Sequence, residues 1–137
     1  MGEALTGLPR EAYEAFGLFY AGEGSQYTGK IIVYGDLLLP IMGGEPDLAA
    51  AAKRADAALA VLERYPERSD CRYAAALFRL VRAKAVLIPQ LRAAYAAGDR
   101  AEMAELAERI PEIIHLTEAV RQAHQERWRM YHKQAGW

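Results

Sequence analysis

The residues of this chain that could carry chemistry are three histidines, one cysteine and the carboxylates, and the histidines are poorly spaced for binding a metal. His115, His124 and His132 lie nine and eight residues apart. Two helical metal ligands need to be one turn apart, as in His-x-x-x-His, and no such pair is present. His124 falls on an apolar helical stripe, which favours a histidine packed in the core or at its rim over a catalytic base. We therefore expect no metal and no cofactor.

The cysteine and the carboxylates also lack the arrangement that catalysis needs. Cys71 lies near an expected helix start, where a thiol pKa can fall, but no motif beside it indicates a nucleophile. We interpret it as a small apolar residue. No aspartate is followed by a glutamate, and we expect no catalytic residue. Most glutamates are expected on solvated helix faces: Glu63, Glu102, Glu105, Glu108, Glu112, Glu118 and Glu126.

Phosphate and nucleic acid are poor candidates for ligands. Residues 22–24 (GEG) lack the third glycine and the strand–helix context of a phosphate-binding loop. Trp128, Tyr131 and Trp137 are interleaved with basic residues and could stack on bases. The formal net charge of -1 argues against that function. We expect these aromatic residues to pack in the core or to dock on another domain.

Nothing in the sequence indicates a membrane segment. The longest apolar runs, residues 31–34 and 37–42, are far shorter than the ~20 residues of a membrane-spanning helix. Residues 1–10 lack the basic and apolar regions of a signal peptide. A single cysteine suits a reducing compartment. We therefore expect a cytoplasmic protein with no membrane partner.

The distribution of glycine divides the chain into two parts. The chain has 137 residues, 53% of them hydrophobic, which is enough for one globular domain. Nine of its eleven glycines precede residue 45, and the remainder is rich in alanine, arginine and glutamate. Glycine disfavours a helix and alanine favours it. We expect a single domain over residues 1–137, loop-rich in 1–45 and helical in 46–134.

In the loop-rich part, a short helix is expected over residues 8–20, with Pro9 in its first turn and Tyr13, Phe16 and Tyr20 on one face. Residues 22–29 are expected to form a loop. Residues 30–42 are ambiguous, because 31–34 favour a strand by propensity but no partner strand is visible. We expect an extended piece there, followed by a turn or short helix over 36–42.

Three further helices are predicted from capping residues and apolar spacing. Pro46 and Asp47 begin one, which Pro66 ends. Its predicted apolar stripe is Leu48, Ala52, Ala55, Leu59 and Leu62.

Ser69 is the predicted N-cap of the next helix, which Pro89 is expected to kink rather than stop. Gly98 then resembles a left-handed C-cap, and Asp99 is the expected N-cap of a last helix over residues 100–133, which Pro111 splits or kinks. The predicted fold is all-α: an irregular bundle of about four helices with a long antiparallel hairpin and a loop-rich N-terminal third.

Several stretches together resemble one family. Residues 94–100 (AYAAGDR) are similar to an A-Y-x-x-G-D-R element, and Leu80 and Lys84 precede it on the same helix. Trp128 followed by residues 133–137 (KQAGW) resembles W…N-K-P-F-G-W, and residues 33–39 (VYGDLLL) resemble L-Y-x-D-P-L-L. These elements are typical of the C-terminal helical region of bacterial family 20 glycoside hydrolases, in the exo-β-N-acetylhexosaminidase branch. Proline is replaced at Leu37 and Gln134, and phenylalanine at Ala135.

The resemblance implies an accessory role. Members act through a (β/α)₈ barrel, in which an adjacent aspartate and glutamate support a substrate-assisted hydrolysis of terminal β-linked N-acetylhexosamine. This chain has no Asp-Glu dipeptide, and 137 residues cannot form a barrel of ~250. We therefore expect a non-catalytic fragment of a larger enzyme, whose partner is the catalytic barrel of the same polypeptide, or a second subunit in a homodimer.

The expected domain or subunit interface comprises Tyr34, Asp36, Trp128, Tyr131 and Trp137. Two alternatives remain open. The first is a stand-alone helical-bundle protein that forms a homodimer without an enzymatic parent. The second is a small-ligand pocket, for which the candidate lining residues are Tyr13, Phe16, Tyr34, His124 and Trp128.

Overall fold

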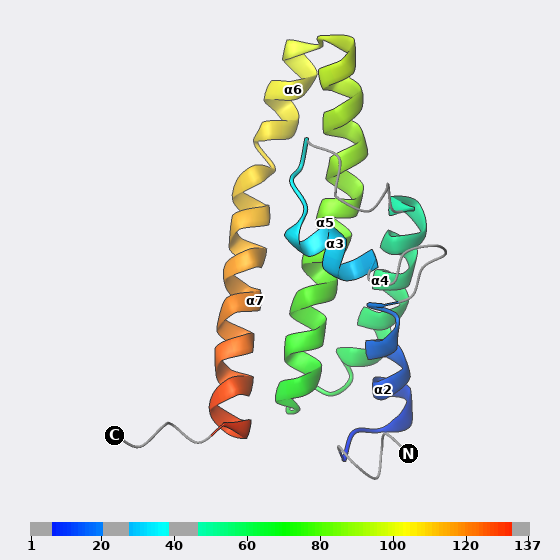
Figure 1. Cartoon of the computed structure of the whole chain (residues 1–137), viewed down its shortest axis with the longest axis vertical. Helices are drawn as coiled ribbons and strands as arrows, with labels where there is room; N and C mark the ends of the chain where they lie inside the picture. The colour runs from blue at the N-terminus through cyan, green and yellow to red at the C-terminus, as the bar shows by residue number, and fades with distance from the viewer. Residues whose placement is uncertain (1–6, 21–27, 39–46, 133–137) are drawn as a thin grey trace.

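The computed structural model describes residues 7–20, 28–38 and 47–132, and within these ranges every regular element is an α-helix (Figure 1). The all-α prediction is confirmed. None of these helices is long and apolar enough to span a membrane. The helices are α2 (Arg10–Gly17), α3 (Thr28–Tyr34), α4 (Leu48–Leu62), α5 (Ser69–Ala97), α6 (Arg100–Ala107) and α7 (Ile110–Tyr131).

The long α5 is the axis of the molecule. Figure 1 shows α4 and α2 along one side of it, α6 and α7 returning antiparallel along the other, and α3 crossing it. The turn between α5 and α6 contains the predicted capping residues. Gly98 is left-handed (φ 67°, ψ 21°), and the Asp99 side chain accepts a hydrogen bond from the Glu102 amide at 3.0 Å. The antiparallel hairpin is confirmed.

The two helix prolines have different consequences. Pro89 lies inside α5, which continues to Ala97, so the helix is not stopped. Pro111 lies in the first turn of α7, and the preceding α6 ends at Ala107, four residues earlier. A proline ring collides with the carbonyl four residues before it, which accounts for the break. The expected last helix is therefore two helices.

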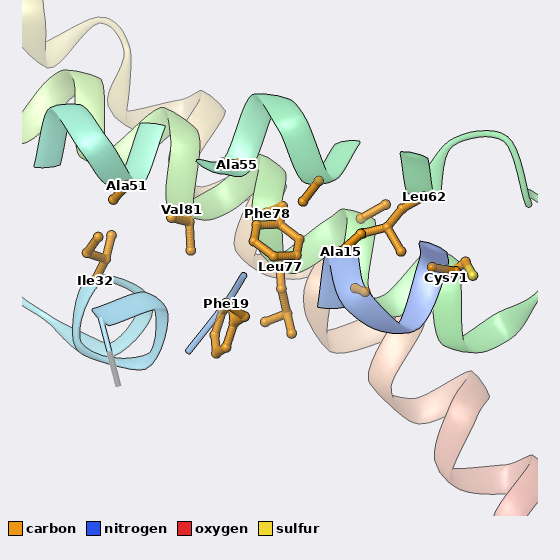
Figure 2. Packing of buried hydrophobic residues seen from close by; sticks show 14 of the residues in the cluster. Ala15, Phe19, Ile32, Ala51, Ala55, Leu62, Cys71, Leu77, Phe78 and Val81 are labelled. Atoms are coloured by element: carbon orange, nitrogen blue, oxygen red, sulfur yellow. The ribbon is translucent and has the colours of Figure 1, made fainter. Parts of the chain in front are cut away.

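The main core lies between α4 and α5, closed by α3 and the end of α2. Figure 2 shows Phe78 of α5 between Ala55 of α4 and Phe19, and the Phe19 and Phe78 rings meet edge to face with centroids 5.9 Å apart. Ala51, Ala55, Ala58 and Leu62 form the buried face of α4. Small residues on this face bring the two helices close together.

Two predicted helix faces are rotated from those observed. On α4, the predicted stripe members Leu48, Ala52 and Leu59 are only half-buried. On α2 and the turn after it, Ala12, Ala15 and Phe19 are buried. Of the residues expected to share a face there, Tyr13 and Tyr20 are exposed and Phe16 is half-buried. Ala12, Ala15 and Phe19 are therefore on the buried face, and Tyr13 and Tyr20 remain at the surface.

The expectation of an extended piece in residues 30–42 is wrong up to Tyr34. This stretch begins within α3, where Ile32 is fully buried in the core. Burial therefore overrides the strand propensity of the β-branched residues. Residues 35–38 are neither helix nor strand, and 39–42 lie outside the described residues.

Two element boundaries also differ from the predictions. The N-cap of α5 is Arg68, one residue before Ser69. The expected loop 22–29 overlaps α3, in which the Gly29 amide donates to the Phe19 carbonyl at 2.9 Å. A Cβ on Gly29 would lie 2.5 Å from that oxygen, so this approach requires glycine.

Candidate docking surface

The residues that most often perform chemistry are dispersed or inert in the described part of the chain. No group of three His, Cys, Asp or Glu there could hold a metal ion. His124 is exposed at the rim, where its ring contacts Tyr73 and Trp128. The His132 ring stacks on Trp128 with the centroids 3.5 Å apart. These histidines belong to an aromatic cluster and do not form a proton-transfer pair.

Cys71 lies in the first turn of α5 and is 2% exposed. Burial raises the pKa of its thiol above the ordinary value. A thiol that stays protonated and inaccessible is a poor nucleophile. The interpretation of Cys71 as a small apolar residue therefore agrees with its surroundings.

Side chains of α7 gather around Tyr73 of α5, and the Tyr34 phenol of α3 lies near it. The ring centroid of Tyr73 lies 5.4 Å from that of His124 and 5.7 Å from the guanidinium carbon of Arg127. Burial raises the pKa of Tyr73, and the phenols of Tyr34 and Tyr20 raise it further, whereas Arg127 opposes them. We call the set Tyr34, Tyr73, His124, Trp128 and Tyr131 the aromatic surface.

Three members of the aromatic surface are large and exposed. Tyr34 is 80% exposed, Trp128 54% and Tyr131 56%. They are not packed in the core, which was one of the two expectations for the C-terminal aromatic residues. Trp137 lies outside the described residues. Large apolar groups at the surface add little to a stabilising core and are available for contact with a partner.

The α7 part of the aromatic surface is held by Asp70, in the first turn of α5. One carboxylate oxygen of Asp70 accepts from Nε of Arg127 and the other accepts from the Tyr131 hydroxyl, each at 2.6 Å. The hydrogen bond to Asp70 raises the pKa of Tyr131. Arg127 also lies 5.3 Å from the centroid of the Tyr131 ring. The end of α7 is thereby fixed to the beginning of α5.

The α3 part is held by Lys84 of α5, which is 6% exposed. Its ammonium donates to the carbonyl of Val33 at 2.9 Å and to that of Gly35 at 2.6 Å. Burial lowers the pKa of Lys84, and the nearby Asp36 carboxylate opposes the shift. Asp36 is exposed, and its side chain accepts from the Leu38 amide at 2.7 Å.

The sequence alone does not reveal Asp70, Tyr73 or Lys84 as parts of this surface. Tyr73 and Lys84 both fall on the apolar stripe of α5, where a lysine is unusual. That irregularity, and the place of Lys84 in the family pattern, direct attention to the residue but do not reveal what it binds. Asp70 has no comparable signal, because its partners are 57 and 61 residues away.

The suggested ligand pocket is only partly assembled. Tyr13 and Phe16 line a hollow of about 280 Å³ together with Arg127 and Tyr131. The other suggested residues, Tyr34, His124 and Trp128, do not line it. A hollow of about 610 Å³ lies between α4, α5 and α7, and alanines form much of its wall: Ala75, Ala76, Ala119 and Ala123.

The geometry therefore defines a class of protein: an all-α domain with an exposed aromatic surface and no assembled catalytic or metal centre in its described residues. Residues 27–137 match the family model described as the Glycoside Hydrolase 20C C-terminal domain. The chain belongs to this family, as the resemblance predicted, and is an accessory domain of a family 20 glycoside hydrolase, linked to a catalytic domain in the same polypeptide. No curated protein and no solved structure matches it significantly.

Proposed function

We propose that this domain docks on the catalytic barrel of its own polypeptide through the aromatic surface, and that it thereby stabilises the barrel. The observation that carries the proposal is the exposure of Tyr34, Trp128 and Tyr131 on backbone that is otherwise well anchored. Aromatic side chains held in one geometry lose little conformational entropy when they are buried, and they commonly dominate interfaces. Asp36, exposed beside Tyr34, would lie at the polar rim of this interface.

The chemistry is assigned to the catalytic domain. We propose that the parent enzyme is a cytoplasmic exo-β-N-acetylhexosaminidase that removes terminal β-linked N-acetylhexosamine by a substrate-assisted mechanism. The resemblance of residues 33–39 and 94–100 to that branch supports this activity. The accessory domain contributes no catalytic group. Clear hydrolysis of a chromogenic N-acetylglucosaminide by residues 1–137 alone, abolished by an acidic-residue substitution, would contradict that assignment.

Hydroxyl-radical footprinting of the full-length enzyme tests the docking. Tyr34 is 80% exposed in this domain, and Tyr95, at the far end of the hairpin, is 65% exposed, so Tyr95 is an internal control. Without docking, Tyr34 would oxidise at least as fast as Tyr95. We expect the order to be reversed, with Tyr34 several-fold slower, and Trp128 and Tyr131 protected as well. Equal or faster oxidation of Tyr34 would refute the proposal.

The same measurement identifies the occupant of the surface. Protection by the barrel of the same polypeptide is independent of enzyme concentration, whereas protection by a second subunit is lost on dilution. A parallel measurement of mass by light scattering shows whether a dimer is present. Tyr34→Ala is expected to shorten the thermal half-life of the enzyme, and Tyr95→Ala is expected to leave it unchanged.

A further inference from the structure

Lys84 is the most unusual buried group in the described part of the chain. Its side chain lies among the leucines of α5, and it is 6% exposed. Lysine is almost never buried to this degree without a partner, because its charge loses hydration. The hydrogen-bond partners of Lys84 are two backbone carbonyls of another segment.

Those carbonyls lie at the carboxyl end of α3, which has no basic residue in its last turn. The final carbonyls of a helix lack intrahelical partners, and a cation there is favourable. Ile31 is satisfied locally, because its carbonyl accepts from the Gly35 amide at 2.8 Å. The Val33 and Gly35 carbonyls are satisfied by Lys84, so α5 supplies the cap that α3 lacks.

The residue between the two bound carbonyls is Tyr34. Its backbone is therefore held on both sides, whereas its side chain is the most exposed of the large hydrophobic side chains in the described residues. Ile32, two residues earlier, is fully buried and anchors the other face of the helix. Only the side-chain torsions of Tyr34 remain free, which lowers the entropy that docking must remove.

We propose that Lys84 is a positioning residue, which holds the backbone on both sides of Tyr34 and so fixes the direction in which Tyr34 meets the catalytic domain. The inference rests on the proposed docking function and adds that docking through Tyr34 requires Lys84. Presentation of Tyr34 depends on a side chain that never touches the partner. Asp70 separately holds Arg127 and Tyr131, and with them the end of α7 that carries Trp128, so Trp128 and Tyr131 should not depend on Lys84.

The test is footprinting of the full-length enzyme with Lys84→Met, which removes the donors and keeps an unbranched side chain. We expect oxidation of Tyr34 relative to Tyr95 to rise severalfold, toward the ratio for an undocked Tyr34, and Trp128 to stay protected. Leu91→Ala is the matched control, because Leu91 is a buried residue of α5 in the cluster that α5 forms with α6 and α7. It destabilises α5 seven residues beyond Lys84 and leaves both hydrogen bonds to Val33 and Gly35 in place, so both residues should stay protected.

A purely structural role and a positioning role predict different results. If Lys84 only stabilises the fold, Lys84→Met and Leu91→Ala will change Tyr34 and Trp128 alike, and the inference is wrong. Unchanged protection of Tyr34 in Lys84→Met also overturns it, while docking itself stands. If Tyr34 is unprotected in the wild-type enzyme, the proposed function fails first. Should Lys84→Met not fold, Lys84→Gln, which keeps a shorter donor, is read by the same criteria.

Discussion

Helices α4 and α7 both pack on α5, yet they bury different shares of their residues. Of the 15 residues of α4, four are buried, and three of these are alanines. Of the 22 residues of α7, Ile113 is the one that is buried. α4 buries one face to complete a core, whereas α7 keeps Ile114, Trp128 and Met130 in solvent. An element can therefore be fully ordered by one neighbour and still present apolar groups for another.

The largest effect is expected on the α4 side of this comparison. Phe78→Ala removes a ring that is 2% exposed and is packed against Phe19. We expect a loss of about 3–5 kcal/mol in the free energy of unfolding, because a large cavity forms where four elements meet. Urea denaturation followed by circular dichroism measures it. A loss below about 1 kcal/mol would mean that this core is not the main source of stability.

A smaller effect is expected where α7 meets α5. Ile113→Ala should lower the free energy of unfolding by about 2 kcal/mol. This is at the low end for such a truncation, because Ile113 lies at the edge of the cluster that joins α5 to α6 and α7. Its neighbour Ile114, which is 65% exposed, is the matched control. Ile114→Ala should change the unfolding free energy by less than about 0.5 kcal/mol. Equal losses in the two variants would contradict the observed face of α7.

The end of α7 can be released from α5 through Asp70. Asp70→Asn weakens the contacts to Arg127 and Tyr131, and we expect a loss of about 1 kcal/mol in unfolding free energy. Asp56→Asn is the control, because Asp56 pairs with Arg82 at a more exposed site. That variant should be close to wild type in the same urea titration. A larger loss of unfolding free energy in Asp56→Asn than in Asp70→Asn would contradict this prediction.

The smallest effect concerns the Tyr131 hydroxyl and depends on pH. The pKa of Tyr131 is raised above 10.0 in the folded chain by its hydrogen bond to Asp70. The stabilisation that this hydrogen bond gives the folded chain is therefore complete below pH 10.0, and it is lost as pH rises through the pKa of Tyr131 in the folded state. The difference in unfolding free energy between wild type and Tyr131→Phe should shrink in that range. A difference that is constant with pH would show that the hydrogen bond is not formed.

The parts of the fold that the sequence predicts are those with local causes. Gly98, Asp99 and Asp47 act within a few residues of themselves. The structure shows the expected left-handed turn, the expected cap at Asp99 and a helix that begins after Asp47. Pro111 likewise ends one helix and begins another through its own ring. Signals of this kind need no knowledge of the tertiary structure.

The missed features have tertiary causes. α3 is helical because Ile32 is buried in a distant core and Lys84, about 50 residues on, binds its last carbonyls. The candidate interface was predicted from a family pattern, and the contacts that position it were not. Tyr131 and Asp70 are 61 residues apart, and no periodicity within one helix can associate them.

Pro89 interrupts the backbone hydrogen bonds of α5 although the helix continues through it. It has no amide hydrogen, so the carbonyl of Ala85 loses its usual helical donor. Before this point α5 contributes to both the main core and the cluster that joins it to α6 and α7, whereas beyond it Leu91 and Ala94 belong to the second cluster alone. We expect amide hydrogens beyond Pro89 to exchange with solvent as a separate, faster unit, so that the hairpin tip opens while the base of the domain stays closed.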